Sequence, residues 1–147
     1  MAFKRITAAE AARFVKNGDN VGLSGFTPAG TPKAVIHEVG IMAHELHEQG
    51  QEFQISLFTG ASTGDSCDGI LSREHALRFR APYTTNKDFR TAVNSGEIAY
   101  TDINLSHMAQ EMRYGFYGKL NIAIMEAFDV TDDGKIWVTA GVGIAPT

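Results

Sequence analysis

The chain has 147 residues, of which 44% are hydrophobic and 20% charged, enough apolar material for the core of one domain and too much for a disordered chain. Thirteen Lys and Arg against seventeen Asp and Glu give a formal net charge of −4 without a basic block, so we expect no nucleic-acid or membrane partner. The single cysteine, Cys67, excludes an intrachain disulfide, and no apolar run approaches the ~20 residues that span a bilayer. We expect a cytoplasmic protein.

In the first half of the chain, helical and extended patterns alternate. Thr7 and Glu10 have the spacing of a capping box, in which a hydroxyl and a carboxylate bind free backbone N–H groups at a helix start. Thr31-Pro32 likewise predicts the cap and the first residue of a helix. The elements expected here are a helix over 8–16, a strand over 20–24, a helix over 31–49 and a strand over 53–58 with period two.

The second half continues the alternation after a segment, 67–83, that we interpret as a short helix and an irregular crossover. The elements expected beyond it are a helix over 86–95, a short strand and turn over 99–105, a helix over 107–114 capped by Ser106, a strand over 120–125, and a strand over 135–139 after a turn. The spacing fits right-handed crossovers and predicts an α/β fold, a three-layer, open, mainly parallel sheet with helices on both faces. Residues 140–147 resemble a further strand-end loop, so we expect an incomplete domain.

Three patterns resemble known sites but lack the spacing or the neighbouring residues that those sites require. The run H-E-L-H at 44–47 is one residue short of H-E-x-x-H, so we expect a solvated helix face and no metal. The loop Gly25–Gly30 has neither the lysine position of a P-loop nor the G-x-G-x-x-G of a dinucleotide site. Cys67 lies between Asp65 and Asp68 without a basic neighbour, which indicates an ordinary small residue rather than a nucleophile.

Two loops of small residues follow predicted strands. In a parallel sheet Gly25–Gly30 and Gly60–Gly64 meet at the carboxyl edge, where open α/β folds bind ligands with backbone N–H groups and helix N-termini. They form a candidate rim for a carboxylate, acyl or phosphate group, and a glycine-rich connection without a ligand is the alternative. Glu126, after the strand over 120–125, is a further candidate as base or nucleophile, or as a solvent-exposed or capping group.

Six segments in order carry a family resemblance. They are G-F-T-P-A-G-T-P-K at 25–33, G-A-S-T-G-D at 60–65, R-A-P-Y at 80–83, N-S-G-E at 94–97, L-S-H at 105–107 and Y-G-K-L-N-I-A-I-M-E-A at 117–127. Together they resemble the amino-terminal portion of the acetyl-CoA hydrolase/transferase family, the class I CoA-transferases that act on succinate, propionate, acetate or 4-hydroxybutyrate. Asn104 and Asn121 depart from the His and Asp that the family usually has there.

The resemblance implies a transferase or hydrolase that moves CoA between short-chain acyl-CoA and carboxylic acids. Family members have two similar α/β halves, related in fold to sugar-phosphate isomerases, and this chain resembles most of the first. The second half holds the glutamate that becomes a glutamyl-CoA thioester and most of the binding site for coenzyme A, the co-substrate. We therefore expect no catalytic residue in this chain, no activity from it alone, and a homodimer at full length. Which carboxylic acid is used is not determined.

The resemblance and the strand-end position together predict the site. The expected substrate-binding residues are Gly25, Phe26, Ala29, Gly30, Ser62, Thr63 and Gly64, with Ser106, His107 and Glu126 as further candidates. Two alternatives stay open. One is a phosphosugar isomerase-like enzyme on a related fold, and the other is a non-catalytic subunit of a two-chain transferase.

Overall fold

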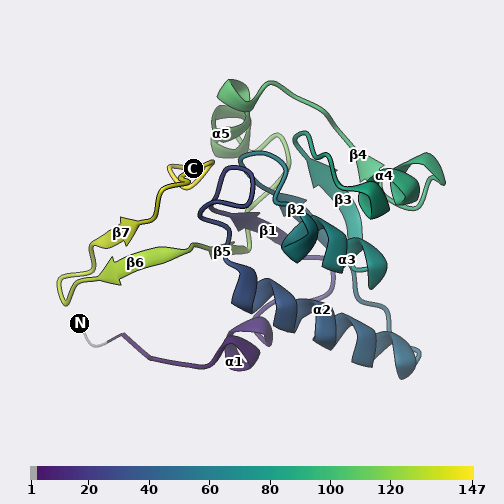
Figure 1. The fold of residues 1–147 in the computed structure, drawn as a ribbon, viewed down its shortest axis with the longest axis horizontal. Helices are drawn as coiled ribbons and strands as arrows, with labels where there is room; N and C mark the ends of the chain where they lie inside the picture. Colours follow the sequence, from purple (N-terminus) through teal and green to yellow (C-terminus); the bar gives the residue numbers. More distant parts are fainter. Residues whose placement is uncertain (1–2) are drawn as a thin grey trace.

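Five parallel strands form the sheet of the computed structural model, which describes residues 3–147 (Figure 1). Every neighbouring pair in the order β4-β3-β2-β1-β5 is parallel, so the carboxyl ends of all five strands meet at one edge. The α/β prediction is confirmed. The strands are β1 (Asn20–Leu23), β2 (Ile55–Phe58), β3 (Leu77–Ala81), β4 (Ala99–Tyr100) and β5 (Ile122–Ile124).

Helices supply the apolar layers that a parallel sheet needs on its two faces. Residues of the first four helices pack with the strands in the larger core, and α5 contributes to a smaller one. In residues 3–147 no helix combines the length and apolar character that crossing a membrane requires. The helices are α1 (Ala8–Ala12), α2 (Lys33–Glu48), α3 (Ile70–Arg73), α4 (Lys87–Asn94) and α5 (Leu105–Arg113), with a π-helical turn η1 (Asp65–Gly69) leading into α3.

The strand β2 lies in the middle of the sheet and is buried on both faces. Leu57 belongs to the larger core and its neighbour Phe58 to the smaller one, because successive side chains of a strand point to opposite faces. The strand predicted over 53–58 from the period-two pattern is confirmed as Ile55–Phe58. Ser56, a polar residue of that pattern, is also buried, and Arg78 donates from Nε to its hydroxyl at 2.9 Å.

The predicted helix starts are confirmed at some positions and shifted at others. At α1 the capping box forms, with Thr7 N donating to Glu10 Oε2 at 2.8 Å. The helix α2 begins at Lys33 without a side-chain cap, so Thr31 is not its cap. The cap of α5 is Asn104, whose Oδ1 accepts from the backbone N–H of Ser106 at 3.1 Å, and the prediction of a Ser106 cap is wrong. Asn is at least as good a cap as Ser.

Two strands differ from the sequence interpretation. The crossover predicted over 67–83 contains β3, an inner strand whose L-R-F-R-A sequence carries two arginines. The strand predicted over 135–139 exists as β7 (Ile136–Val138) but lies outside the parallel sheet, because it pairs antiparallel with β6 (Ala127–Val130). Figure 1 shows this hairpin projecting from the carboxyl end of β5.

The central position of β2 predicts how much a cavity in the core lowers the free energy of unfolding. Leu57 is fully buried, so Leu57→Ala should lower the free energy of unfolding by roughly 2–5 kcal/mol through lost apolar contact and a residual cavity. Urea denaturation followed by circular dichroism measures it. Ile41→Ala on the exposed side of α2 is the control and should change the value by about 0.5 kcal/mol or less. Equal losses for the two variants would contradict this placement of the core.

Candidate functional site

The carboxyl edge of the sheet brings together the loops that follow β1, β2, β3 and β5. After β1, Ser24 forms an isolated antiparallel bridge with Gly143, and Gly25 N donates to the carbonyl of Val142 at 3.4 Å. After β2, Thr59 N donates to the carbonyl of Ala81 at 3.2 Å. The residues 140–143 near the carboxyl terminus therefore join the two predicted loops as a third segment of this edge.

Glycines let these segments approach backbone to backbone. A Cβ added at Gly60 would overlap the Gly25 carbonyl oxygen and the backbone of Gly143, and one added at Gly30 would overlap the carbonyl of Gly141. Gly25 and Gly30 also adopt positive φ values of 108° and 72°, which side chains disfavour. Both are buried. Their first role is thus to pack the loops together, and contact with a substrate stays a prediction for them.

The tip of the first loop is the part that faces solvent. Phe26 N donates to the carbonyl of Ala29 at 2.9 Å, which closes a tight turn over residues 26–29, all of them exposed. Phe26 keeps 49% of its surface accessible. Gly64 of the second loop lies beside Pro28, since a Cβ at Gly64 would come within 3.6 Å of the proline ring. The structure therefore places Gly64 against the exposed turn that carries Phe26 and Ala29.

Glu126 is fixed at the same edge by three contacts. Its backbone N–H donates to the buried Ser24 hydroxyl at 2.9 Å, and that hydroxyl donates to the carbonyl of Gly30 at 2.7 Å. The carboxylate accepts from Thr139 Oγ1 at 3.0 Å and from Lys33 Nζ at 3.3 Å. A carboxylate held by an ammonium and a hydroxyl is suited to position neighbouring groups, and less to act as a free nucleophile.

Ser62 and Thr63, predicted at the rim, point inward instead. The Ser62 hydroxyl is buried and lies 3.0 Å from the Thr84 hydroxyl, and it accepts from Thr85 N at 3.1 Å. Thr63 is buried as well, and its backbone N–H donates to Asp68 Oδ2 at 2.8 Å. These residues support the second loop from within. A direct contact with substrate stays a prediction for both.

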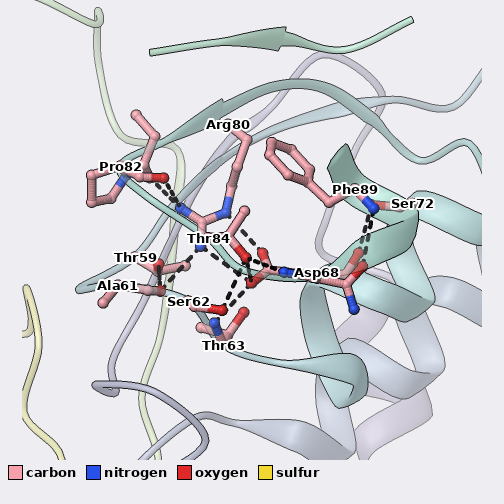
Figure 2. Close-up of polar contacts among 12 residues, drawn as sticks. Thr59, Ala61, Ser62, Thr63, Asp68, Ser72, Arg80, Pro82, Thr84 and Phe89 are labelled. Atoms are coloured by element: carbon pink, nitrogen blue, oxygen red, sulfur yellow. Dashed lines mark hydrogen bonds and ion pairs between the residues drawn. The ribbon is translucent and has the colours of Figure 1, made fainter. Parts of the chain in front are cut away.

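The second glycine loop is supported by a buried ion pair between Arg80 of β3 and Asp68 of η1 (Figure 2). Arg80 Nε donates to Asp68 Oδ1 at 2.9 Å, and Nη2 reaches Oδ2 at 3.5 Å. The remaining guanidinium hydrogens go to three carbonyls: Nη1 binds those of Ala81 (2.6 Å) and Pro82 (3.2 Å), and Nη2 binds that of Ala61 (3.1 Å). All five guanidinium N–H donors are therefore occupied.

Asp68 stays ionised although it is fully buried. Burial by itself raises the pKa of this carboxyl group, but the charge of Arg80 and hydrogen bonds from Arg80, Thr63 N and the Thr84 hydroxyl together lower the pKa below its usual value. From the sequence, Arg80 stands out only within the R-A-P-Y motif, and Asp68 has no predicted role. Arginines that alternate with apolar residues in the strand-length run L-R-F-R-A, together with an acidic residue earlier in the chain, were the available signal.

The remaining predicted residues lie elsewhere or have local partners. Ser106 Oγ donates to Asn104 Oδ1 at 3.0 Å as part of the α5 cap, and His107 is exposed on the first turn. Within residues 3–147 neither has a hydrogen bond to the glycine loops. Burial, followed by the Asp68 charge, raises the pKa of the Cys67 thiol to about 12, which agrees with its interpretation as a non-nucleophilic residue.

The histidines of α2 do not converge on a common point. His44 Nδ1 lies 3.0 Å from the carboxylate of Glu74, and His47 Nε2 lies 3.0 Å from the carbonyl oxygen of Phe53. In the part of the chain that the structure describes, no group of three or more His, Cys, Asp or Glu side chains is placed to hold a metal ion.

Comparison with known proteins places the chain among CoA enzymes. A family model described as the acetyl-CoA hydrolase/transferase N-terminal domain matches residues 2–147. Propanoyl-CoA:succinate CoA transferase of Escherichia coli is 43% identical over 97% of this chain and 29% of its own length. Succinyl-CoA:acetate CoA-transferase of Clostridium kluyveri is 42% identical (98% and 26%), and acetyl-CoA hydrolase of Schizosaccharomyces pombe is 34% identical (90% and 26%). The chain thus spans between 26% and 29% of these relatives.

Solved structures share the fold at low sequence identity. RipA from Yersinia pestis aligns with a TM-score of 0.61 and 12% identity over 89% of this chain and 30% of that chain. The C56S variant of the decarboxylase AibA/AibB aligns with a TM-score of 0.52 and 15% identity over 75% of this chain and 42% of its own.

The buried ion pair generates a stability prediction. Asp68→Asn keeps the shape of the side chain but leaves Arg80 as an unpaired buried charge, so the free energy of unfolding should fall by about 3–5 kcal/mol. The matched control is Asp65→Asn, which removes an exposed partner of Arg73 and should cost about 1 kcal/mol or less. Urea denaturation measures both, and equal effects would refute the structural role of the buried pair.

The same pair predicts a pH dependence. Because the folded pKa of Asp68 is lowered, its stabilisation is complete above the unfolded pKa of about 3.9 and declines as pH falls toward the folded value. The difference in unfolding free energy between the native chain and Asp68→Asn should therefore shrink from neutral pH to acid pH. Denaturation curves at several pH values test this. A difference that stays constant would show that the carboxyl group does not change its pKa on folding.

Proposed function

Because the chain belongs to the acetyl-CoA hydrolase/transferase family, we propose that it forms the amino-terminal part of an enzyme that moves CoA between short-chain acyl-CoA and carboxylic acids. The observation that carries the proposal is the match of nearly all 147 residues to the amino-terminal domain model, together with 42–43% identity to two CoA-transferases. The family chemistry passes through a glutamyl-CoA thioester. Its nucleophilic glutamate belongs to the second half. This chain would then shape the substrate site and position the substrate.

The accessible tip of the first loop is the proposed contact with the acyl or carboxylate group. Phe26 and Ala29 face solvent there, with Gly64 beside them, while Gly25 and Gly30 hold the loop against neighbouring backbone. An exposed apolar wall at the carboxyl edge of the sheet suits the hydrocarbon part of a short acyl chain. In this proposal Ser62 and Thr63 act indirectly, by supporting the second loop.

Lys33 and Glu126 give this rim a fixed pair of charges. The ammonium of Lys33 is about half exposed at the start of α2 and pairs with Glu126, which is bound to Ser24 beneath the first loop. We propose that the pair holds the first loop in register with β5. If Lys33 moved toward a substrate carboxylate, the Glu126 carboxylate would lose this ion pair and keep only the hydrogen bond from Thr139.

Hydrolysis of acetyl-CoA is the second candidate activity, since a 34% identical relative is named for it. The two activities differ in the final acceptor, which is a carboxylic acid in the transferase and water in the hydrolase. Omission of the carboxylic acid separates them in one assay of the full-length protein: CoA release then continues for a hydrolase and stops for a transferase. A cytoplasmic homodimer stays a prediction for the full-length protein.

The isolated 147-residue chain should have no transferase activity, because the proposed nucleophile lies in the second half. Incubation with acetyl-CoA and succinate should give no succinyl-CoA above the rate without protein, measured by chromatography of the CoA esters. Turnover by the pure chain would contradict the proposal and would place Glu126 first among the nucleophile candidates. Glu126→Gln would then abolish that turnover.

Added bulk at the loop tip should impair the full-length enzyme without unfolding it. Ala29 is exposed, so Ala29→Leu should leave the melting temperature within a few degrees and lower kcat/KM for the larger carboxylic acids by roughly tenfold, about 1.4 kcal/mol of transition-state binding. The matched control is Ala9→Leu on the exposed side of α1, before the amino end of β1, which should leave kcat/KM unchanged. Equal kinetics for the two variants would exclude the tip from the substrate site.

A further inference from the structure

The β6–β7 hairpin carries large apolar side chains on both faces. Ile136 and Trp137 are neighbours on β7, so they point to opposite faces, and both are more than half exposed. On β6, Val130 pairs with Ile136, and Phe128 keeps 84% of its surface accessible. A strand pair that faces water normally carries polar residues on its exposed face. Apolar groups on both faces indicate that the hairpin is covered on both.

Within residues 3–147 the hairpin has little to cover it. Its strands pair only with each other there, and an isolated two-stranded hairpin is marginally stable in water. Figure 1 shows it standing away from the parallel sheet. An open hollow of about 750 Å³ lies between its strands and residues 3–5, where Phe3 is half exposed. Its lining is mixed, with apolar Phe3, Phe128, Val130 and Ile136 beside charged Lys4, Arg5, Asp129 and Asp132, and it is large enough for several side chains of another segment.

The adjoining edge of the sheet is also uncovered. β5 is the outermost strand on this side, so the outer backbone groups of Ile122–Ile124 have no strand partner within the described residues. Parallel strands are normally covered, and an open apolar edge readily accepts another strand. A mostly apolar hollow beside this edge is lined by Leu120, Ala123 and Ile144 and extends to Thr147. The open edge leads directly into the hairpin through Glu126.

We propose that the hairpin and the outer edge of β5 form one docking surface for the polypeptide that follows this region in its relatives. The relatives are more than three times as long, and the match is to their amino-terminal domain, so most of their length lies outside the region that this chain matches. A polypeptide continuing from Thr147 starts beside β5. A covalently linked segment binds at high effective concentration, and the exposed Phe128, Ile136 and Trp137 offer the apolar contact that permanent interfaces use.

The test compares hydrogen exchange in the 147-residue chain and in the full-length protein that contains it. Amides of β5 and of residues 127–138 should exchange at least about 100-fold more slowly in the full-length protein, while β2 is protected in both. The protection should be the same at low and high protein concentration. Equal exchange in the two proteins would overturn the proposal, and protection that rises with concentration would instead assign the surface to a second copy.

A variant separates docking from general stability. Replacing both Phe128 and Trp137 by Ser in the full-length protein should raise exchange across the hairpin and β5, whereas Phe116→Ser, an exposed aromatic residue outside the surface, should not. Unchanged protection in the double variant would refute the docking role. If the double variant does not fold, the comparison of the two wild-type proteins decides alone. Exchange is measured without substrate, so a failure of the proposed activity leaves this test unaffected.

Discussion

The buried pair of Arg80 and Asp68 is the interaction on which the carboxyl edge depends. A guanidinium inside a parallel sheet is costly unless every donor is satisfied, and here five N–H groups find two carboxylate oxygens and three backbone carbonyls. The partners come from β3, from η1 and from the loop after β2. One interaction therefore fixes the position of the second glycine loop relative to the strand beside it.

Backbone contact between glycines fixes the position of the first glycine loop, after β1. Because Gly25, Gly30 and Gly60 lack side chains, the loops after β1 and β2 and the segment near Gly143 come within van der Waals contact of one another. This arrangement buries the glycines and leaves the tip around Phe26 exposed. The small residues of the rim thus divide into those that bring segments together and those that are available to a ligand.

The positions of the uncovered surfaces agree with the length of the relatives. The parallel sheet is covered on its inner strands, but the outer edge of β5 and the hairpin beyond it expose apolar groups. In the proposed function the nucleophilic glutamate belongs to another part of the polypeptide, and the proposed substrate rim lies at the same edge of the sheet as the start of that hairpin (Figure 1). A second half docked there would bring its own groups close to the tip of the first loop.

Local patterns determined the parts of the structure that depend on neighbouring residues. The Thr7 capping box, the helix within 86–95 and the alternation that leads to a parallel α/β sheet are all readable from the sequence, because they rest on short-range hydrogen bonds and periodicity. The order of six motifs pointed to the family in the same way.

Tertiary structure decided where distant residues meet. β3 could not be recognised because Arg80 is tolerated in a buried strand only when Asp68, twelve positions earlier, is folded against it. The inward direction of Ser62 likewise depends on Thr84, across the sheet edge, and the separation of β7 from the parallel sheet depends on its pairing with β6. Composition and spacing locate such groups along the chain, but their burial and partners are set by contacts between elements, which no local pattern encodes.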